Sequence, residues 1–258
     1  MTLMSKKFNL FIGIDQTGAT NKNDKPKNLP VCLIYKNIIY PNLLLSELKF
    51  ESLSQLIQQT LNIKLDHLNR LRPLILIDSV FTLPSELKIT HHQLLTRSHT
   101  YKFNNKSFGA VTAFNFFNSF LIHGSTALPQ RKIELKLKAN SVFKLKPFQR
   151  NIGCGSYRVL KELSADRNWF KLWPIDKKQN AWATIAEGYP SFYWKTLFNL
   201  KNRPQKKSFK FKNTIFNFKT TDHMDAFVLA IAAQKYNKLV WLIPNAISQK
   251  EGWVLGVT

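Results

Sequence analysis

Two short apolar runs, each ending in an aspartate, place the strongest constraint on how this chain folds. Residues 8–15, FNLFIGID, set apolar side chains at every second position, which is the period of a strand with one buried face. Residues 74–78, LILID, are apolar without interruption up to the aspartate, which is typical of a central strand buried on both faces. Because burying an acid without a partner is costly, we expect Asp15 and Asp78 to have a cation or hydrogen-bond donors nearby.

Three further acids stand beside apolar segments, in a chain that has few acids. Glu187 follows the run ATIA, and Asp222 and Asp225 open the helix-like stretch 222–234. The chain has 15 Asp and Glu residues against 38 Lys and Arg, and chance would scatter so few acids over exposed loops and helix faces. Several carboxylates brought together repel one another unless a divalent metal neutralises them. The pattern therefore indicates a metal site in a strongly basic protein.

The remaining elements are predicted from periodicity and turn residues. We expect strands at residues 8–15, 31–35, 38–42, 74–78, 184–187, 239–243 and 253–257, and a hairpin with a lysine-bearing face over 131–150. Helices are expected at 46–64, 110–122, 155–165, 190–200 and 222–236, with irregular chain at 82–107 and a solvated loop at 201–212. We find no internal repeat and no domain linker, so we expect one domain, 1–258, with a basic insertion at roughly 82–150.

The formal charge of +23 makes nucleic acid the first partner to consider, because clustered Lys and Arg neutralise phosphates and release counterions. An anionic membrane surface is the rival, but the sequence has no basic amphipathic helix and no apolar stretch near the ~18 residues of a spanning helix. A compositionally biased genome is an alternative source of the many lysines. Cys32 and Cys154 form neither a disulfide framework nor a zinc pattern, so we expect a reducing, cytoplasmic location.

The acids suit one kind of chemistry in particular. Two-metal phosphoryl chemistry needs converging carboxylates that hold two ions ~4 Å apart. Oxygen ligands favour Mg²⁺ or Mn²⁺ over zinc. Asp15, Asp78, Asp222 and Asp225 meet this description. Each also has an ordinary alternative: Asp15 can start a turn, Asp78 can cap the following segment, and Asp222 and Asp225 can cap a helix and favour its dipole. Glu187 is a further candidate, as a metal ligand, a lysine partner or a turn residue.

Other residues suggest contacts with phosphate. His223, between the helix acids, is a candidate proton carrier or phosphate contact, or else a solvent-exposed first-turn histidine. The segments 131–150 and 201–212 mix basic residues with Phe, a combination that can neutralise phosphates and stack on bases. The candidate nucleic-acid contacts are Lys136, Lys138, Lys144, Lys146, Arg150, Lys201, Arg203, Lys206, Lys207, Lys210 and Lys212. The glycines of IGCGSY, at 152–157, could hold a phosphate on backbone amides or mark a tight turn.

The order of these elements and acids resembles the RNase H-like superfamily. The chain is most similar to the predicted RNase H-like nucleases grouped as domain-of-unknown-function family 429. The pieces that carry the resemblance run along nearly the whole chain: FIGIDQTGA, LILIDSVFTLP, IGCGSYRVLKEL, AEGYPSFYW, DHMDAFVLAIAA and EGWVLG. The resemblance implies an α/β fold, with a five-stranded mixed sheet flanked by helices and metal-binding acids along one edge.

The resemblance also implies roles for individual residues. Asp15 matches the family's first-strand acid, Asp78 the acid ending the fourth strand, and Asp225 with Asp222 the acids of the final helix. Glu187 matches a Glu before a Tyr-Pro pair, although Gly188 stands where a larger apolar residue is usual.

We therefore expect a nuclease that hydrolyses phosphodiester bonds with Mg²⁺ or Mn²⁺. In this hypothesis Asp15 bridges two ions, Asp78 and Asp225 hold one each, and Asp222 or Glu187 completes the shell. One alternative is a catalytically inactive nucleic-acid-binding protein on the same fold. Another is an ATPase or kinase, because GIDQTGAT resembles the first phosphate loop of actin-like ATPases and sugar kinases.

Overall fold

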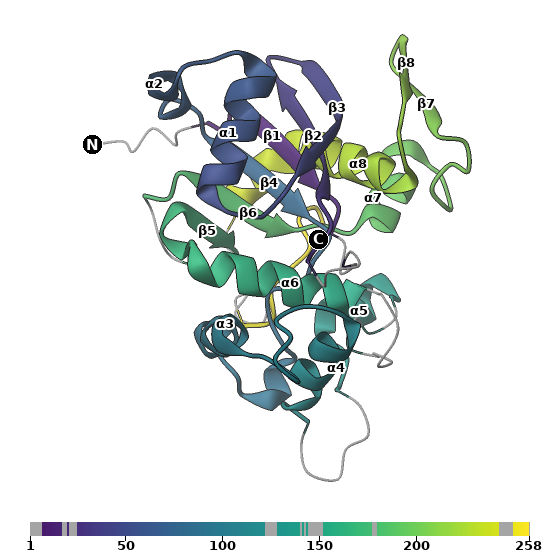
Figure 1. The fold of residues 1–258 in the computed structure, drawn as a ribbon. Coiled ribbons are helices and arrows are strands. Elements are labelled where there is room, and N and C mark those ends of the chain that lie inside the picture. The colour runs from purple at the N-terminus through teal and green to yellow at the C-terminus, as the bar shows by residue number, and fades with distance from the viewer. Residues whose placement is uncertain are drawn as a thin grey trace.

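The computed structural model describes residues 7–16, 20, 25–121, 128–139, 141, 143, 152–176, 180–242 and 250–257. At its centre is a mixed sheet of six strands in the order β3-β2-β1-β4-β6-β5 (Figure 1). The strands are β1 (Leu10–Ile14), β2 (Leu29–Tyr35), β3 (Ile38–Leu45), β4 (Pro73–Ile77), β5 (Phe170–Trp173) and β6 (Ala183–Glu187). The first three are antiparallel neighbours, whereas β1, β4, β6 and β5 run parallel.

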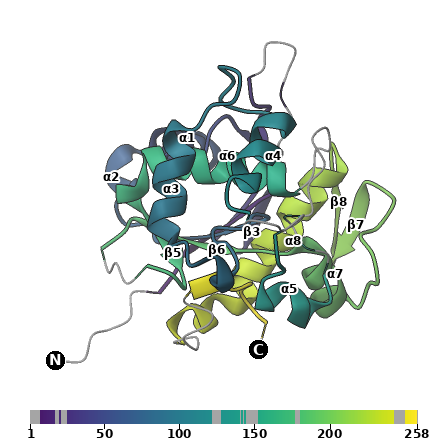
Figure 2. The same ribbon diagram turned by 90° about the horizontal axis from the view of Figure 1, so that it is seen from below.

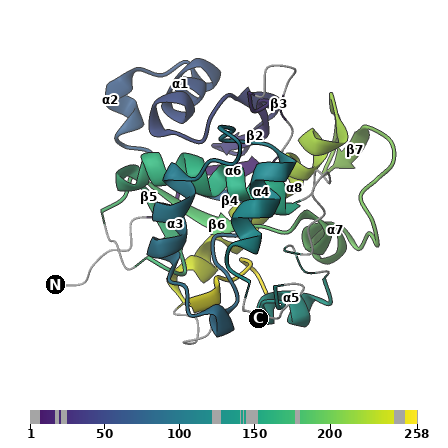
Figure 3. The same ribbon diagram turned by 60° about the horizontal axis from the view of Figure 1, so that its bottom comes forward.

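Helices cover the sheet on both faces, so the predicted α/β class is confirmed. The helices are α1 (Phe50–Leu61), α2 (Leu65–Leu68), α3 (His91–Thr100), α4 (Ala110–Asn118), α5 (Lys132–Leu137), α6 (Ile152–Ala165), α7 (Pro190–Phe198) and α8 (Thr221–Tyr236). Short 3-10 turns are η1 (Ser85–Leu87), η2 (Arg167–Trp169) and η3 (Asn237–Trp241). On one face α8 packs against β1, β2 and β4, with α7 beside it. On the other face lies α6, and α3 and α4 pack against it (Figures 1 and 3).

The alternation of side chains along β4 divides the interior into two hydrophobic clusters. Ile75 and Ile77 belong to the cluster on the α1 and α6 face, and Leu74 and Leu76 to the cluster on the α8 face. This explains why the run LILI is apolar at every position, as a strand buried on both sides requires.

Helix α8 lies unusually close to β1 because of Gly13. A Cβ atom built on Gly13 would lie 2.0 Å from the carbonyl oxygen of Ala226 in α8. Gly13 therefore permits the helix backbone to approach the strand, and this approach carries the start of α8 toward the end of β1.

A small antiparallel hairpin, β7 (Ser208–Phe211) and β8 (Thr214–Asn217), precedes α8. It projects from the body of the protein beside α7 and α8 (Figures 1 and 2). Phe209, Phe211 and Phe216 of the hairpin, and Phe218 directly after it, each contact Phe227 of α8. These rings are part of the packing and are not a free stacking surface for bases.

Several expectations from the sequence were wrong. The sheet has six strands, not five, because β5 adds a parallel edge strand. The alternating run IELKLK forms α5, not a strand, with Ile133 and Glu134 buried. Helix α3 forms in the region expected to be irregular, β7 in the expected loop, and η3 where a strand was expected at 239–243. In the segment 253–257, Val254 forms an isolated bridge to Glu187.

None of the helices among the described residues is long and apolar enough to cross a membrane.

Candidate functional site

Asp15 and Asp78 directly follow two neighbouring parallel strands, β1 and β4, at the same end of the sheet. Ile14 of β1 and Ile77 of β4 are register partners, and the backbone N–H of Asp78 donates to the carbonyl oxygen of Ile14 at 3.1 Å. Ile14 and Ile77 both point into the cluster beneath α6. Because side chains alternate along a strand, the aspartates that follow them turn toward α8.

The first turns of α8 bring two more aspartates to this end of the sheet. The side chain of Thr220 caps the helix by accepting from the backbone N–H of His223 at 3.3 Å. Asp222 and Asp225 lie in the turn that follows. Asp225 accepts a 2.9 Å hydrogen bond from Trp194 Nε1 of α7 at Oδ1, and its Oδ2 is ion-paired with Arg203.

The charges of these residues act on one another, and we call Asp15, Asp78, Asp222 and Asp225 the aspartate cluster. Burial raises the pKa of Asp15 well above its usual value, and the charges of Asp78, Asp225 and Asp222 raise it further. Burial and the charge of Asp225 raise the pKa of Asp78 to about 8. Burial also raises the pKa of Asp225, against the lowering effect of Trp194 and Arg203. The cluster is therefore a set of carboxyl groups that favours a bound cation.

The cluster fits a hard divalent cation by its donor chemistry. All four side chains offer carboxylate oxygens, the ligands that Mg²⁺ and Mn²⁺ prefer. Oδ1 of Asp78 is buried and has no hydrogen-bond partner among the described residues. Within the same residues, however, no three His, Cys, Asp or Glu side chains stand close enough together to hold an ion. Coordination of an ion by this cluster therefore requires its side chains to move closer to one another. One of them, Asp225, is paired with Arg203.

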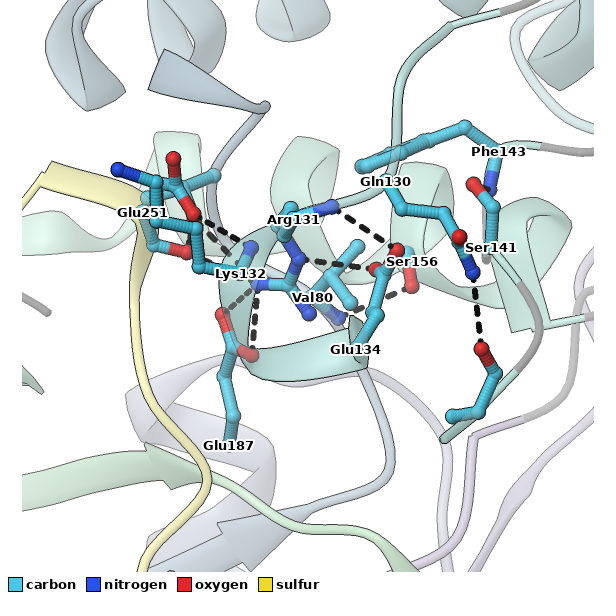
Figure 4. A network of polar contacts seen from close by, with 12 residues as sticks. Val80, Gln130, Arg131, Lys132, Glu134, Ser141, Phe143, Ser156, Glu187 and Glu251 are labelled. Carbon is cyan, nitrogen blue, oxygen red and sulfur yellow. Dashed lines mark hydrogen bonds and ion pairs between the residues drawn. The ribbon is translucent and has the colours of Figure 1, made fainter. Parts of the chain in front are cut away.

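Glu187 lies on the opposite face of the sheet from the aspartate cluster. Glu187 lies on the same face of β6 as Ala183 and Ile185, and both of these point into the cluster beneath α6. Its two carboxylate oxygens accept from Arg131 Nη1 at 2.9 and 2.8 Å (Figure 4). Its Oε1 also accepts from the backbone N–H of Phe81 at 3.0 Å. Glu187 is thus the partner of a buried arginine and stands apart from Asp15 and Asp78.

Arg131 organises a wider buried network around Glu187. Its Nε donates to Glu134 at 3.0 Å, and its Nη1 donates to the carbonyl oxygen of Glu251 at 3.1 Å. The carboxylate of Glu251 accepts from the backbone N–H of Lys132 at 2.7 Å (Figure 4). The network joins α5, β6 and the C-terminal segment. Sequence reasoning missed it because Arg131 was assigned to a hairpin, although Arg131 and Glu134 have the i,i+3 spacing of a helical ion pair.

His223 is buried at the start of α8. Its Nδ1 lies 2.8 Å from Thr220 Oγ1. Burial lowers the pKa of His223, with Lys219 adding to the effect and Asp222 opposing it. The ring therefore helps to fix the start of α8, and the expectation of an exposed first-turn histidine was wrong.

The basic candidates fall into three groups. Lys201, Lys206, Lys207, Lys210 and Lys212 are exposed on and before the β7–β8 hairpin, and Lys136 and Lys138 are exposed on α5. Arg203 is partly exposed and paired with Asp225. Lys144, Lys146 and Arg150 lie outside the described residues. The hairpin thus presents an exposed basic surface directly before the helix that carries Asp222 and Asp225.

The glycines of IGCGSY lie inside α6 and do not form a loop. A Cβ on Gly155 would lie 1.0 Å from Oε1 of Gln16, so this glycine makes room for the residue that follows Asp15. Gly155 therefore serves close packing beside the end of β1, and no phosphate loop forms there.

Comparison of the chain with protein-family models, curated proteins and solved structures finds no match.

Proposed function

We propose that this protein is a divalent-metal-dependent nuclease with an RNase H-like fold, acting on the phosphodiester bonds of nucleic acid. The observation that carries the proposal is that Asp15 and Asp78, at neighbouring parallel strand ends, lie near enough to Asp225 and Asp222 of α8 for the charges of the other three acids to act on Asp15. The charge of each of the other three raises the pKa of Asp15. A mixed sheet with acids at one end is also what the resemblance to RNase H-like proteins implies.

Asp15, Asp78 and Asp225 would hold Mg²⁺ or Mn²⁺, with Asp222 as a fourth ligand. Bound ions of this kind activate a water molecule and stabilise the leaving oxygen in phosphodiester hydrolysis. Trp194 orients Asp225 through its 2.9 Å hydrogen bond. The exposed lysines of the hairpin attract the nucleic-acid backbone toward the cluster, since phosphate contacts position a nucleic acid without reading its sequence.

A second candidate is a nucleic-acid-binding protein of the same fold that does not cleave. The ion pair of Arg203 with Asp225 favours it, because an arginine that permanently neutralises this acid would replace the metal. Such a protein would bind nucleic acid with strong salt dependence and show no metal-dependent turnover.

A cleavage assay with the purified protein separates these candidates. Labelled single- and double-stranded DNA and RNA are incubated with Mn²⁺, with Mg²⁺ and with EDTA. We expect cleavage only with metal, and we expect Asp15→Asn to abolish it while nucleic-acid binding persists. Asp66→Asn, at an exposed aspartate of α2, is the matched control and should cleave normally. Cleavage that persists in Asp15→Asn would overturn the proposed site, and binding without cleavage by the unaltered protein would support the second candidate.

A further inference from the structure

Arg203 is the basic side chain that pairs with the aspartate cluster, among the residues that the structure describes. Its Nη1 contacts Asp225 Oδ2 and lies 3.4 Å from the carbonyl oxygen of Thr221. Since Trp194 already occupies Oδ1, both oxygens of Asp225 are engaged. A metal ion that uses Asp225 through Oδ2 must therefore compete with Arg203 for that oxygen.

The side chain of Arg203 is exposed enough to move away from Asp225. Its side chain is 35% exposed, whereas that of Asp225 is 15% exposed. Arg203 also lies in the segment between α7 and β7, which carries the exposed Lys201, Lys206 and Lys207. Nucleic acid bound by these lysines brings its phosphates close to a guanidinium group, and the planar fork of arginine pairs with phosphate as well as with carboxylate.

We propose that Arg203 exchanges between Asp225 in the free protein and a backbone phosphate of bound nucleic acid, so that nucleic acid and metal bind cooperatively. The inference rests on the proposed function. In the free protein Arg203 neutralises part of the aspartate cluster and weakens its hold on a cation. Bound nucleic acid withdraws the guanidinium and leaves Asp225 Oδ2 free for the metal. Because coupling between two ligands is reciprocal, the metal must strengthen nucleic-acid binding by the same factor.

The test measures binding, not cleavage. Mn²⁺ is titrated into the protein with and without a short phosphorothioate oligonucleotide, which resists hydrolysis, and free Mn²⁺ is followed by electron paramagnetic resonance. In the unaltered protein we expect the oligonucleotide to tighten Mn²⁺ binding at least about fivefold, the lower end of typical couplings. In Arg203→Gln we expect Mn²⁺ to bind at least about fivefold more tightly without the oligonucleotide, and the oligonucleotide to add little.

Lys64→Gln removes one positive charge at an exposed residue outside the proposed binding surface, and it should behave like the unaltered protein. Arg203→Lys keeps the charge without the planar fork and should give a smaller coupling than arginine does. Thermal unfolding checks that each variant is folded.

The outcomes separate the two proposals. Equal Mn²⁺ affinities for Arg203→Gln and Lys64→Gln, together with loss of binding in Asp78→Asn, would overturn the exchange of Arg203 and leave the metal site standing. Absence of Mn²⁺ binding to the unaltered protein and to Arg203→Gln alike would overturn both.

Discussion

One guanidinium nitrogen of Arg131 donates to both carboxylate oxygens of Glu187, at 2.9 and 2.8 Å, in a fully buried pair. Glu187 is thereby neutralised inside the protein. Asp15 and Asp78, on the other face of the same sheet, have no basic side chain paired with them among the described residues. The described residues thus include two kinds of buried acid: Glu187 is paired with an arginine, whereas Asp15 and Asp78 are not paired with a basic side chain.

The first prediction concerns this buried pair. Arg131→Met leaves Glu187 and Glu134 without their partner, and breaking a buried ion pair in this way costs about 3–5 kcal/mol of folding free energy. Glu187→Gln should cost less, because Arg131 keeps Glu134. Urea unfolding measures both. Glu187→Gln should also bind Mn²⁺ as the unaltered protein does. A loss of Mn²⁺ affinity as large as that of Asp78→Asn would show that Glu187 is a metal ligand.

The second prediction concerns pH. The pKa of Asp78 is raised to about 8 in the folded protein, against an ordinary value of 3.8, chiefly by burial. A raised folded-state pKa contributes stability that is present at low pH and lost as the pH rises through the folded value. Without metal, stability should therefore fall between about pH 4 and pH 8, by more than about 1 kcal/mol.

Asp78→Asn removes this titration and should make the fall in stability shallower, with a higher melting temperature than the unaltered protein at pH 8 in EDTA. Asp66→Asn serves again as the exposed control. Melting curves over this pH range check the prediction, and an equally steep fall in Asp78→Asn would contradict it.

The third prediction uses two glycines that face α8. A methyl group at Gly13 would meet the backbone of Ala226 at 2.0 Å, whereas at Gly188 it would meet the flexible end of Leu229 at 2.3 Å. Gly13→Ala must move the helix and should cost about 3 kcal/mol or more, while Gly188→Ala should cost less because a side chain can rotate. Chemical unfolding compares the two. Mn²⁺ affinity should also fall in Gly13→Ala, since Asp225 moves with α8, and equal costs for the two variants would be evidence against this packing.

The fourth prediction concerns the hairpin lysines. Changing Lys206, Lys207, Lys210 and Lys212 together to Gln should weaken nucleic-acid binding and reduce the slope of log affinity against log salt by roughly 1 to 3, since each phosphate contact contributes about 0.7 to 0.9. The matched control changes four exposed basic residues outside the hairpin: Lys64, Arg70, Lys235 and Lys238. Fluorescence anisotropy at several salt concentrations measures both. An equal effect of the two sets would show that binding depends on net charge alone.

Most of the sheet could be predicted, because most of its strands have a recognisable pattern of apolar residues. The run LILI is apolar on both faces and the alternation before Asp15 has a period of two, so β1 and β4 were found close to their observed bounds. Strand β5 has only four residues and follows a 3-10 turn, so it gives no clear period. The run IELKLK alternates like a strand, yet the buried ion pairs of Arg131 and Glu134 hold it as a helix.

The candidate site could be predicted only in part, for a similar reason. Asp15 and Asp78 follow Ile14 and Ile77, which are register partners on neighbouring strands, and this places the two aspartates side by side. The face to which Glu187 points could not be predicted before the register of β4 and β6 was known. In that register Glu187 is the partner of Ile77, so it points to the face opposite Asp78. Arg203 and Trp194 were not linked to Asp225 because their contacts join segments far apart in the sequence.

Binding of a divalent metal by the aspartate cluster can be observed in a crystal. A crystal of the protein soaked in Mn²⁺ tests it most directly through the anomalous scattering of the ion. We expect a peak bound by Asp15, Asp78 and Asp225, which disappears in crystals of Asp15→Asn. A fully soaked crystal with no peak there, and with Arg203 still on Asp225 in the presence of oligonucleotide, would show that the cluster does not bind the metal as proposed.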